Sequence, residues 1–127
     1  MHRIVFLDRQ SLKAEVRRPA FPHSWEDHEQ TLEPDVAARL AQATIAITNK
    51  VPIRRSTLEQ LPHLKMIAVA ATGYDVIDID ACRERGVSVA NIRNYAVHTV
   101  PEHTFAMIFA LRRNLIAYRE DVLRGRW

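Results

Sequence analysis

The sequence predicts an α/β domain in which β-strands and helices alternate around a parallel sheet. Short apolar runs at positions 4–7, 44–48 and 66–71 are each followed by a polar loop and then by helix-forming residues. A further run, 87–90, comes directly after Gly86. Because parallel strands can be joined only through crossover connections, this order predicts four or five parallel strands with right-handed crossovers.

The composition is that of an ordinary globular domain. The chain has 127 residues, of which 47% are hydrophobic and 26% charged, with a formal net charge of +3. The longest apolar run, 105–111, is far too short to cross a bilayer, so no membrane partner is expected. The N-terminus resembles a strand rather than a signal peptide, and a cytoplasmic location is the default expectation.

The arginines near the C-terminus account for much of the basic excess. Acidic residues interleave with them and no aromatic platform accompanies them, which favours a solvated helix face over nucleic-acid binding. Nucleic-acid binding is kept as the weaker alternative, and it predicts a steep salt dependence.

Metal and thiol chemistry are not expected. The single cysteine, Cys82, excludes an internal disulfide, and its position in a predicted helix favours a buried apolar role. His98 and His103 are five residues apart, which misses the spacing of a helical metal pair. The metal-site prediction is therefore none.

In chain order, the strand at 4–7 should lead into a helix that Ser11 caps and that runs to about Arg17, where Pro19 and Pro22 end it. The stretch 21–31 reads as loop, with a possible short strand near 25–30. A helix with Pro34 in its first turn should follow, and then the strand at 44–48.

Ser56 and Glu59 have the spacing of a capping box and predict a short helix there. After the strand at 66–71, Asp75 and Asp78 suit the start of a helix that Gly86 closes as its C′ residue.

The C-terminal part predicts one long helix. Thr99, Pro101 and Glu102 form a cap signature, and apolar residues then recur at helical spacing through to Leu123. We therefore expect a helix of about 25 residues, longer than the usual helix of about 11–12. Together these elements indicate a flavodoxin-like doubly wound sheet that ends in a long crossing helix.

Function is expected at the loops beyond the carboxyl ends of the strands. Thr72 and Gly73 follow a central strand, and the free amides of such a turn bind anions such as carboxylate. An ordinary turn in which Gly73 supplies a positive φ remains the alternative. Lys50 could add positive charge to the same rim or be simply solvated, and Tyr95 could contact a carboxylate or pack on the sheet edge.

Dinucleotide binding lacks its usual sequence signature. The chain has only three glycines, Gly73, Gly86 and Gly125, and no two of them share a turn. A dinucleotide fingerprint needs several glycines in one tight turn. The residues alone therefore predict a domain that binds a small anion.

Three segments carry a resemblance to a known family. The stretch 71–78 (Ala-Thr-Gly-Tyr-Asp-Val-Ile-Asp), the stretch 86–91 (Gly-Val-Ser-Val-Ala-Asn) and the stretch 99–103 (Thr-Val-Pro-Glu-His) resemble the D-isomer-specific 2-hydroxyacid dehydrogenases. The resemblance covers nearly the whole chain and is closest to the glycerate dehydrogenase (hydroxypyruvate reductase) branch. Relatives often have Pro-Gly where this chain has Arg93-Asn94, but asparagine tolerates the left-handed conformation.

The resemblance implies a division of the chain into a substrate-binding domain, 1–98, and an interdomain and dimerisation helix, 99–127. The Rossmann domain, with the catalytic residues and most of the NAD or NADP site, is expected to lie outside this chain. Backbone amides of Thr72 and Gly73 would hold the carboxylate of a small 2-keto or 2-hydroxy acid, and Tyr95 would line the pocket. Thr99 would lie near the nicotinamide end of the cofactor.

The function that the resemblance implies is the substrate-binding part of an NAD(P)-dependent oxidoreductase, inactive by itself and dimeric through the C-terminal helix. The alternative is a non-catalytic interaction module of corepressor type, in which the apolar helix recruits a partner.

Overall fold

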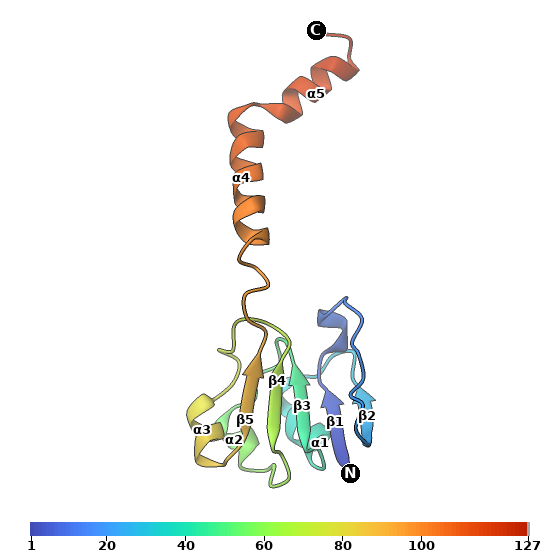
Figure 1. Ribbon diagram of the computed structural model, residues 1–127, viewed down its shortest axis with the longest axis vertical. Coiled ribbons are helices and arrows are strands. Elements are labelled where there is room, and N and C mark those ends of the chain that lie inside the picture. The colour runs from blue at the N-terminus through green and yellow to red at the C-terminus, as the bar shows by residue number, and fades with distance from the viewer. Residues whose placement is uncertain (127) are drawn as a thin grey trace. The chain divides into compact units, whose positions relative to one another are not determined.

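The computed structural model describes residues 1–126 and contains a five-stranded, all-parallel sheet in the order β2-β1-β3-β4-β5 (Figure 1). The strands are β1 (His2–Phe6), β2 (His23–Asp27), β3 (Ile45–Thr48), β4 (Met66–Val69) and β5 (Ser88–Asn91). This order confirms the predicted flavodoxin-like α/β fold. The chain forms two compact units, Met1–Arg93 and a second that begins at Asn94.

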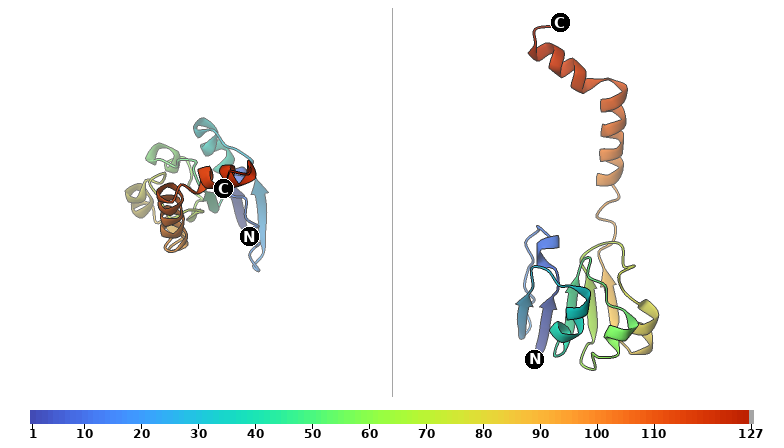
Figure 2. Two further views of the ribbon diagram at one scale, coloured as in Figure 1. Left: turned by 90° about the horizontal axis from the view of Figure 1, so that it is seen from above. Right: turned by 180° about the vertical axis from the view of Figure 1, so that it is seen from behind.

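Three helices cover one face of the sheet in the first unit: α1 (Val36–Leu40), α2 (Arg55–Leu58) and α3 (Ile79–Glu84). Seen from behind in Figure 2, they lie in front of the strands. Short 3₁₀ turns, η1 (Arg9–Ser11) and η2 (Glu33–Asp35), follow β1 and precede α1.

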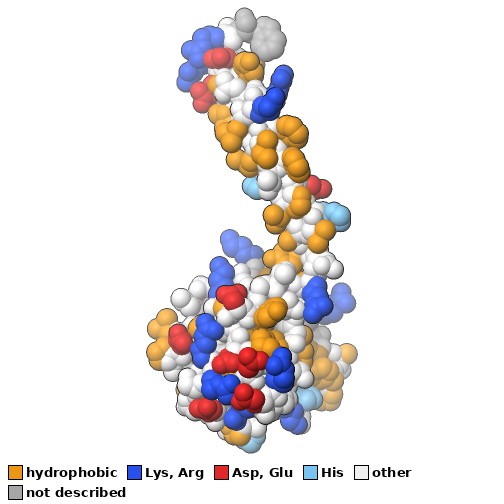
Figure 3. All heavy atoms as spheres, turned by 90° about the vertical axis from the view of Figure 1, so that its left-hand side faces the viewer, with side chains coloured by type: hydrophobic (Ala, Val, Ile, Leu, Met, Phe, Trp, Pro, Cys, Tyr) orange, Lys and Arg blue, Asp and Glu red, His pale blue; other side chains and the backbone are white. Residues whose placement is uncertain are grey.

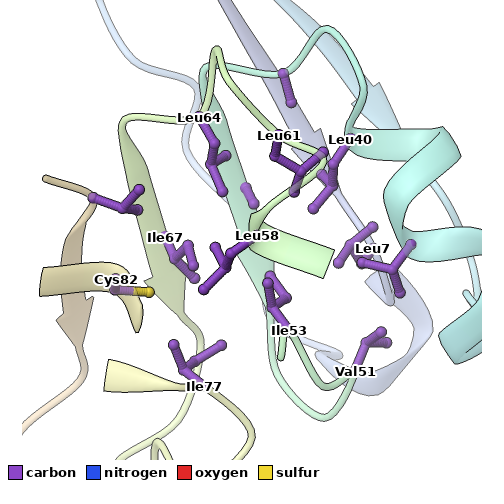
Figure 4. Packing of buried hydrophobic residues seen from close by; sticks show 14 of the residues in the cluster. Leu7, Leu40, Val51, Ile53, Leu58, Leu61, Leu64, Ile67, Ile77 and Cys82 are labelled. Carbon is purple, nitrogen blue, oxygen red and sulfur yellow. The ribbon is translucent and has the colours of Figure 1, made fainter. Parts of the chain in front are cut away.

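Apolar side chains from alternate strand positions meet these helices in the core. Val5, Ala46 and Ile67 of the strands belong to one core cluster with Leu40 of α1 and Leu58 of α2, and all of them are essentially inaccessible to solvent. Figure 4 shows Ile67, Leu40 and Leu58 within this cluster. Fully burying a leucine or isoleucine side chain is worth about 1.5–3 kcal/mol. This packing fixes the strands and therefore the loops at their carboxyl ends.

On the opposite face of the sheet, the prediction for the segment after β1 is wrong. The helix expected from Ser11 to about Arg17 does not form, because the 3₁₀ turn η1 ends at Ser11 and Leu12 is already extended, with φ −121° and ψ 107°. The guanidinium of Arg9 donates to the carbonyl oxygens of Leu12 and Ala14, which holds this segment in a non-helical path. The segment instead helps to line an apolar hollow of about 280 Å³ over β1, β3 and β4.

The predicted start of α2 is also wrong. Ser56 lies inside the helix, and the residue that precedes the helix is Arg54, whose carbonyl accepts from Leu58 N at 2.9 Å. A parallel bridge between Ile53 and Ile77 fixes the chain directly before the helix, with Ile53 N donating to Val76 O at 2.9 Å. This tertiary pairing decides the helix start over the local capping signal.

The predicted C-terminal end of α3 is confirmed, but its predicted start is wrong, because the capping-box spacing placed the cap at Asp75 and the structure has it at Asp78. An oxygen of the Asp78 carboxylate accepts from Ala81 N at 2.9 Å, as an N-cap side chain should. Gly86 follows the helix with φ 67°, and Val87 N donates to Cys82 O at 2.8 Å.

The second unit contains α4 (Thr99–Arg112) and α5 (Leu115–Leu123), so the single helix of about 25 residues was a wrong prediction. Asn114 separates them with φ 53°, a left-handed conformation that asparagine tolerates better than most residues. The predicted cap at Thr99 is not formed either, because helical bonding begins earlier, with Val100 N donating to Ala96 O at 3.2 Å.

Apolar side chains are exposed along both of these helices (Figure 3). The rings of Phe105 and Phe109 stack on one another, with centroids 6.2 Å apart, and each side chain is 57% exposed. Within residues 1–126, no helix combines the length and hydropathy that crossing a membrane would need.

Candidate functional site

In the loop between β4 and α3, the carbonyl groups of Ala71 and Thr72 are hydrogen-bonded, whereas the amides of Thr72 and Gly73 are free. Ile92 N, directly after β5, donates to Ala71 O at 3.0 Å, and Asn91 Nδ2 donates to Thr72 O at 2.7 Å. Thr72 and Gly73 are exposed, and their peptide N–H groups donate no hydrogen bond to any residue that the structure describes. Two neighbouring N–H groups are thus available to an anion at the carboxyl edge of the sheet.

Gly73 does not serve as a turn residue with positive φ. Within residues 1–126, positive φ values occur only at Asn94, Asn114, Gly86 and Gly125. A Cβ atom on Gly73 would lie 3.2 Å from Asp75 Oδ1, closer than ordinary van der Waals contact. The positive φ that the ordinary-turn alternative assigned to Gly73 is therefore wrong, and what glycine provides here is an uncovered backbone.

Lys50 is held at the same edge of the sheet by a buried carboxylate. Asp8, which follows β1 and is 4% exposed, accepts from Lys50 N at 2.8 Å and from Asn49 N at 3.0 Å. The Lys50 side chain is exposed and lines a hollow of about 230 Å³ together with Asp8 and Ser11. Thr72 and Gly73 do not line this hollow, so the structure places the lysine beside the β1 loop.

A second hollow, of about 330 Å³, adjoins the loop on the side of the edge strand β5. Tyr74, Asn91 and Arg93 give it a polar rim. Its apolar floor comes from α3, from β5 and from Val87 just before β5, and the other lining residues there are Ile79, Cys82 and Val89.

Tyr95 and Thr99 both belong to the second unit. Tyr95 is 62% exposed and follows Asn94, whose φ of 62° confirms that asparagine accepts the left-handed turn expected at this position. Thr99 is exposed and is the first residue of α4. The binding roles expected for these two residues stay predictions.

The thiol of Cys82 is not an activated nucleophile. Burial, followed by the negative charge of Asp78, raises the pKa of the Cys82 thiol, and the side chain is 1% exposed. The hydrogen bond and the charge of Arg55 lower the pKa of Glu84 on the surface. No group of three or more His, Cys, Asp and Glu residues capable of holding a metal ion occurs in the described part of the chain.

Asp8 and Asn91 were missed as functional candidates by reasoning from the sequence. Each is a polar residue at or just after the carboxyl end of a strand, which is the only signal that the sequence offers for them. Their partners are peptide groups 41 and 19 residues away, at Asn49 and Thr72.

Comparison with known proteins gives consistent matches over almost the whole chain. The family model described as D-isomer specific 2-hydroxyacid dehydrogenase, catalytic domain, matches residues 4–124. A glycerate dehydrogenase of Methylorubrum extorquens is 53% identical over 126 residues, which is 98% of this chain and 40% of the relative. A putative 2-hydroxyacid dehydrogenase of Haemophilus influenzae is 39% identical over 127 residues, again 40% of its length.

Among solved structures, an NAD-dependent formate dehydrogenase of Staphylococcus aureus in complex with NAD superimposes with a TM-score of 0.71 at 19% identity. That match covers 100% of this chain and 42% of the other and shows a shared fold. The chain spans about 40% of the length of the curated relatives it matches over nearly its whole extent.

Proposed function

Since the chain belongs to the D-isomer-specific 2-hydroxyacid dehydrogenase family, we propose that it forms the substrate-binding part of an NAD(P)-dependent oxidoreductase acting on small 2-hydroxy and 2-keto acids. Glycerate and hydroxypyruvate are the proposed pair, because glycerate dehydrogenase is the name of the relative with 53% identity.

The observation that carries this proposal is the pair of free amides in the β4–α3 loop. A carboxylate has two oxygens that accept hydrogen bonds, and the N–H groups of Thr72 and Gly73 are consecutive donors with no partner among the described residues. Charge-assisted hydrogen bonds of this kind are about twice as strong as neutral ones. The loop would hold the acid group and leave the neighbouring carbonyl carbon of a 2-keto acid to the reaction.

This chain contributes orientation rather than proton or hydride transfer. NAD or NADP supplies the hydride when it is bound, and the only residue of this chain that we assign to it is Thr99, near the nicotinamide end. No glycine-rich turn of this sequence could cradle a pyrophosphate. Fixing the substrate carboxylate also fixes the direction from which a hydride can reach the reacting carbon. Positioning of this kind can account for much of the rate enhancement of an enzyme.

Lys50 and Tyr95 complete the proposed binding residues. Lys50 would add positive charge at the carboxyl edge of the sheet, and its loop is fixed by Asp8. Tyr95 would contact the bound acid through its hydroxyl group. A cytoplasmic location stays a prediction.

Binding can be tested on the 127-residue chain by ¹⁵N-¹H NMR titration with hydroxypyruvate. We expect the largest shifts at the amides of Thr72 and Gly73, and none with dihydroxyacetone, which replaces the carboxylate by a neutral hydroxymethyl group. Equal shifts with both compounds, or shifts confined to other loops, would rule out a carboxylate site here.

We further propose that the chain forms homodimers through α4. Phe105 and Phe109 lie four residues apart on one side of α4 and are each more than half exposed, and an apolar helix face of this kind is typical of an interaction surface. Sedimentation should show a concentration-dependent dimer, and Phe105→Ser with Phe109→Ser should abolish it. Recruitment of a different protein by a persistently monomeric chain would support the corepressor-type alternative instead.

A further inference from the structure

The carbonyl oxygens of Ala71 and Thr72 directly precede the free amides of Thr72 and Gly73. Residues at the end of β5 hold these two oxygens in two different ways. Ala71 O accepts from a backbone donor, Ile92 N, at 3.0 Å, whereas Thr72 O accepts from a side chain, Asn91 Nδ2, at 2.7 Å. A substitution can remove the second of these hydrogen bonds without touching the first.

Peptide planarity links each of these bonds to one amide. In a trans peptide the C=O of one residue and the N–H of the next lie in one plane and point in opposite directions, and the described chain has no cis bond. Anchoring Ala71 O therefore orients the Thr72 N–H, and anchoring Thr72 O orients the Gly73 N–H. Both amides then point away from β5.

We propose that Asn91 is a positioning residue that aims the Gly73 N–H at the substrate carboxylate. This inference rests on the proposed function for the carboxylate itself, while the hydrogen bond on which it depends is independent of any ligand. Gly73 has no side chain to restrain its backbone, so the peptide plane between Thr72 and Gly73 has most to lose when Asn91 is replaced.

The environment of Asn91 supports a positioning role. It is the last residue of β5, so its backbone is fixed in the sheet opposite Val69 of β4. Its side chain is partly buried at the rim of the hollow formed with Tyr74 and Arg93. A donor on a rigid strand holds a loop more narrowly than a donor on another loop would.

The first arm of the test measures backbone order without ligand. In Asn91→Ala the ¹⁵N order parameter of Gly73 is expected to fall from about 0.85 to below about 0.6, while that of Thr72 stays near its original value. Asn91→Gln keeps an amide donor and should recover part of the order. The control Gln60→Ala removes another side-chain amide bonded to a carbonyl, Ser56 O, at 2.9 Å, and should change neither value.

The second arm repeats the hydroxypyruvate titration with each variant. In Asn91→Ala the Gly73 N–H is no longer held toward the carboxylate, so the Kd for hydroxypyruvate is expected to rise about fivefold. The temperature of thermal unfolding should not change. An order parameter of Gly73 that is unchanged in Asn91→Ala would overturn the positioning role. If Asn91→Ala lowers the order parameter of Gly73 but the native chain does not bind hydroxypyruvate, the proposed function of this loop fails and the positioning of the backbone by Asn91 stands.

Discussion

The carboxylate of Asp8 lies 2.8 Å from the peptide nitrogen of Lys50, so that the loops after β1 and β3 share one buried hydrogen-bond acceptor. A second bond, from Asn49 N at 3.0 Å, completes the arrangement. The pair explains how an exposed lysine can have a fixed backbone at the edge of the sheet.

Asp8→Ala is expected to destabilise the fold by about 2–3 kcal/mol, because it leaves two amides without their charged acceptor. Urea unfolding measures this change, with substitution of the exposed Glu29 by glutamine as the control. Equal midpoints for the two variants would show that the buried carboxylate contributes nothing to stability.

Gly86→Ala and Gly73→Ala should separate a conformational role from a binding role. Gly86 has φ 67°, where a side chain costs about 1–2 kcal/mol, so this variant should unfold at lower temperature and still bind hydroxypyruvate. Gly73 has no positive φ, and its added Cβ meets only the exposed Asp75 side chain, at 3.2 Å. Gly73→Ala should therefore change stability by less than about 0.5 kcal/mol and yet weaken binding, as paired calorimetric measurements can show.

The surface pair of Arg55 and Glu84 should make stability depend on pH in the acidic range. Arg55 Nη1 lies 2.6 Å from Glu84 Oε2, and this contact lowers the pKa of the Glu84 carboxyl below its usual value. A carboxyl with a depressed pKa in the folded state stabilises the fold above its unfolded pKa, and this contribution is lost as the pH falls through the folded pKa. NMR titration should return the Glu84 pKa to its ordinary range in Arg55→Gln, and high salt should act in the same direction.

Cys82 should react slowly with thiol reagents in the folded chain. Its side chain is 1% exposed, and burial raises the pKa of the thiol, so both access and thiolate fraction are reduced. Alkylation by iodoacetamide near pH 8 is expected to be at least about tenfold faster in urea than in buffer. Comparable rates in the two solvents would contradict a buried, unactivated thiol.

Local sequence signals predicted the elements whose partners are close in the chain. The alternation of strands and helices and the closing Gly86 are both indicated by neighbouring residues, and the structure contains them. The free amides of Thr72 and Gly73 could likewise be suspected from a glycine placed directly after a strand.

The features that the sequence did not predict depend on distant partners. The parallel bridge between Ile53 and Ile77 determines where α2 starts. The hydrogen bond from the Arg9 guanidinium to Leu12 O keeps the segment after η1 non-helical. The break at Asn114 depends on one residue adopting a left-handed conformation, which the apolar periodicity of the flanking helices conceals. Asp8 and Asn91 act through peptide groups that come near them only once the sheet has formed.

The proposed recognition surface consists of main-chain N–H groups, so it would be retained with any residue except proline at position 72. Substitutions at position 72 would then leave the proposed binding of an acid group unchanged, provided that Gly73 and Asn91 are retained. Selection among different acids would have to come from side chains of residues other than Thr72 and Gly73. The backbone groups that hold the acid and the side chains that distinguish one acid from another could therefore evolve separately.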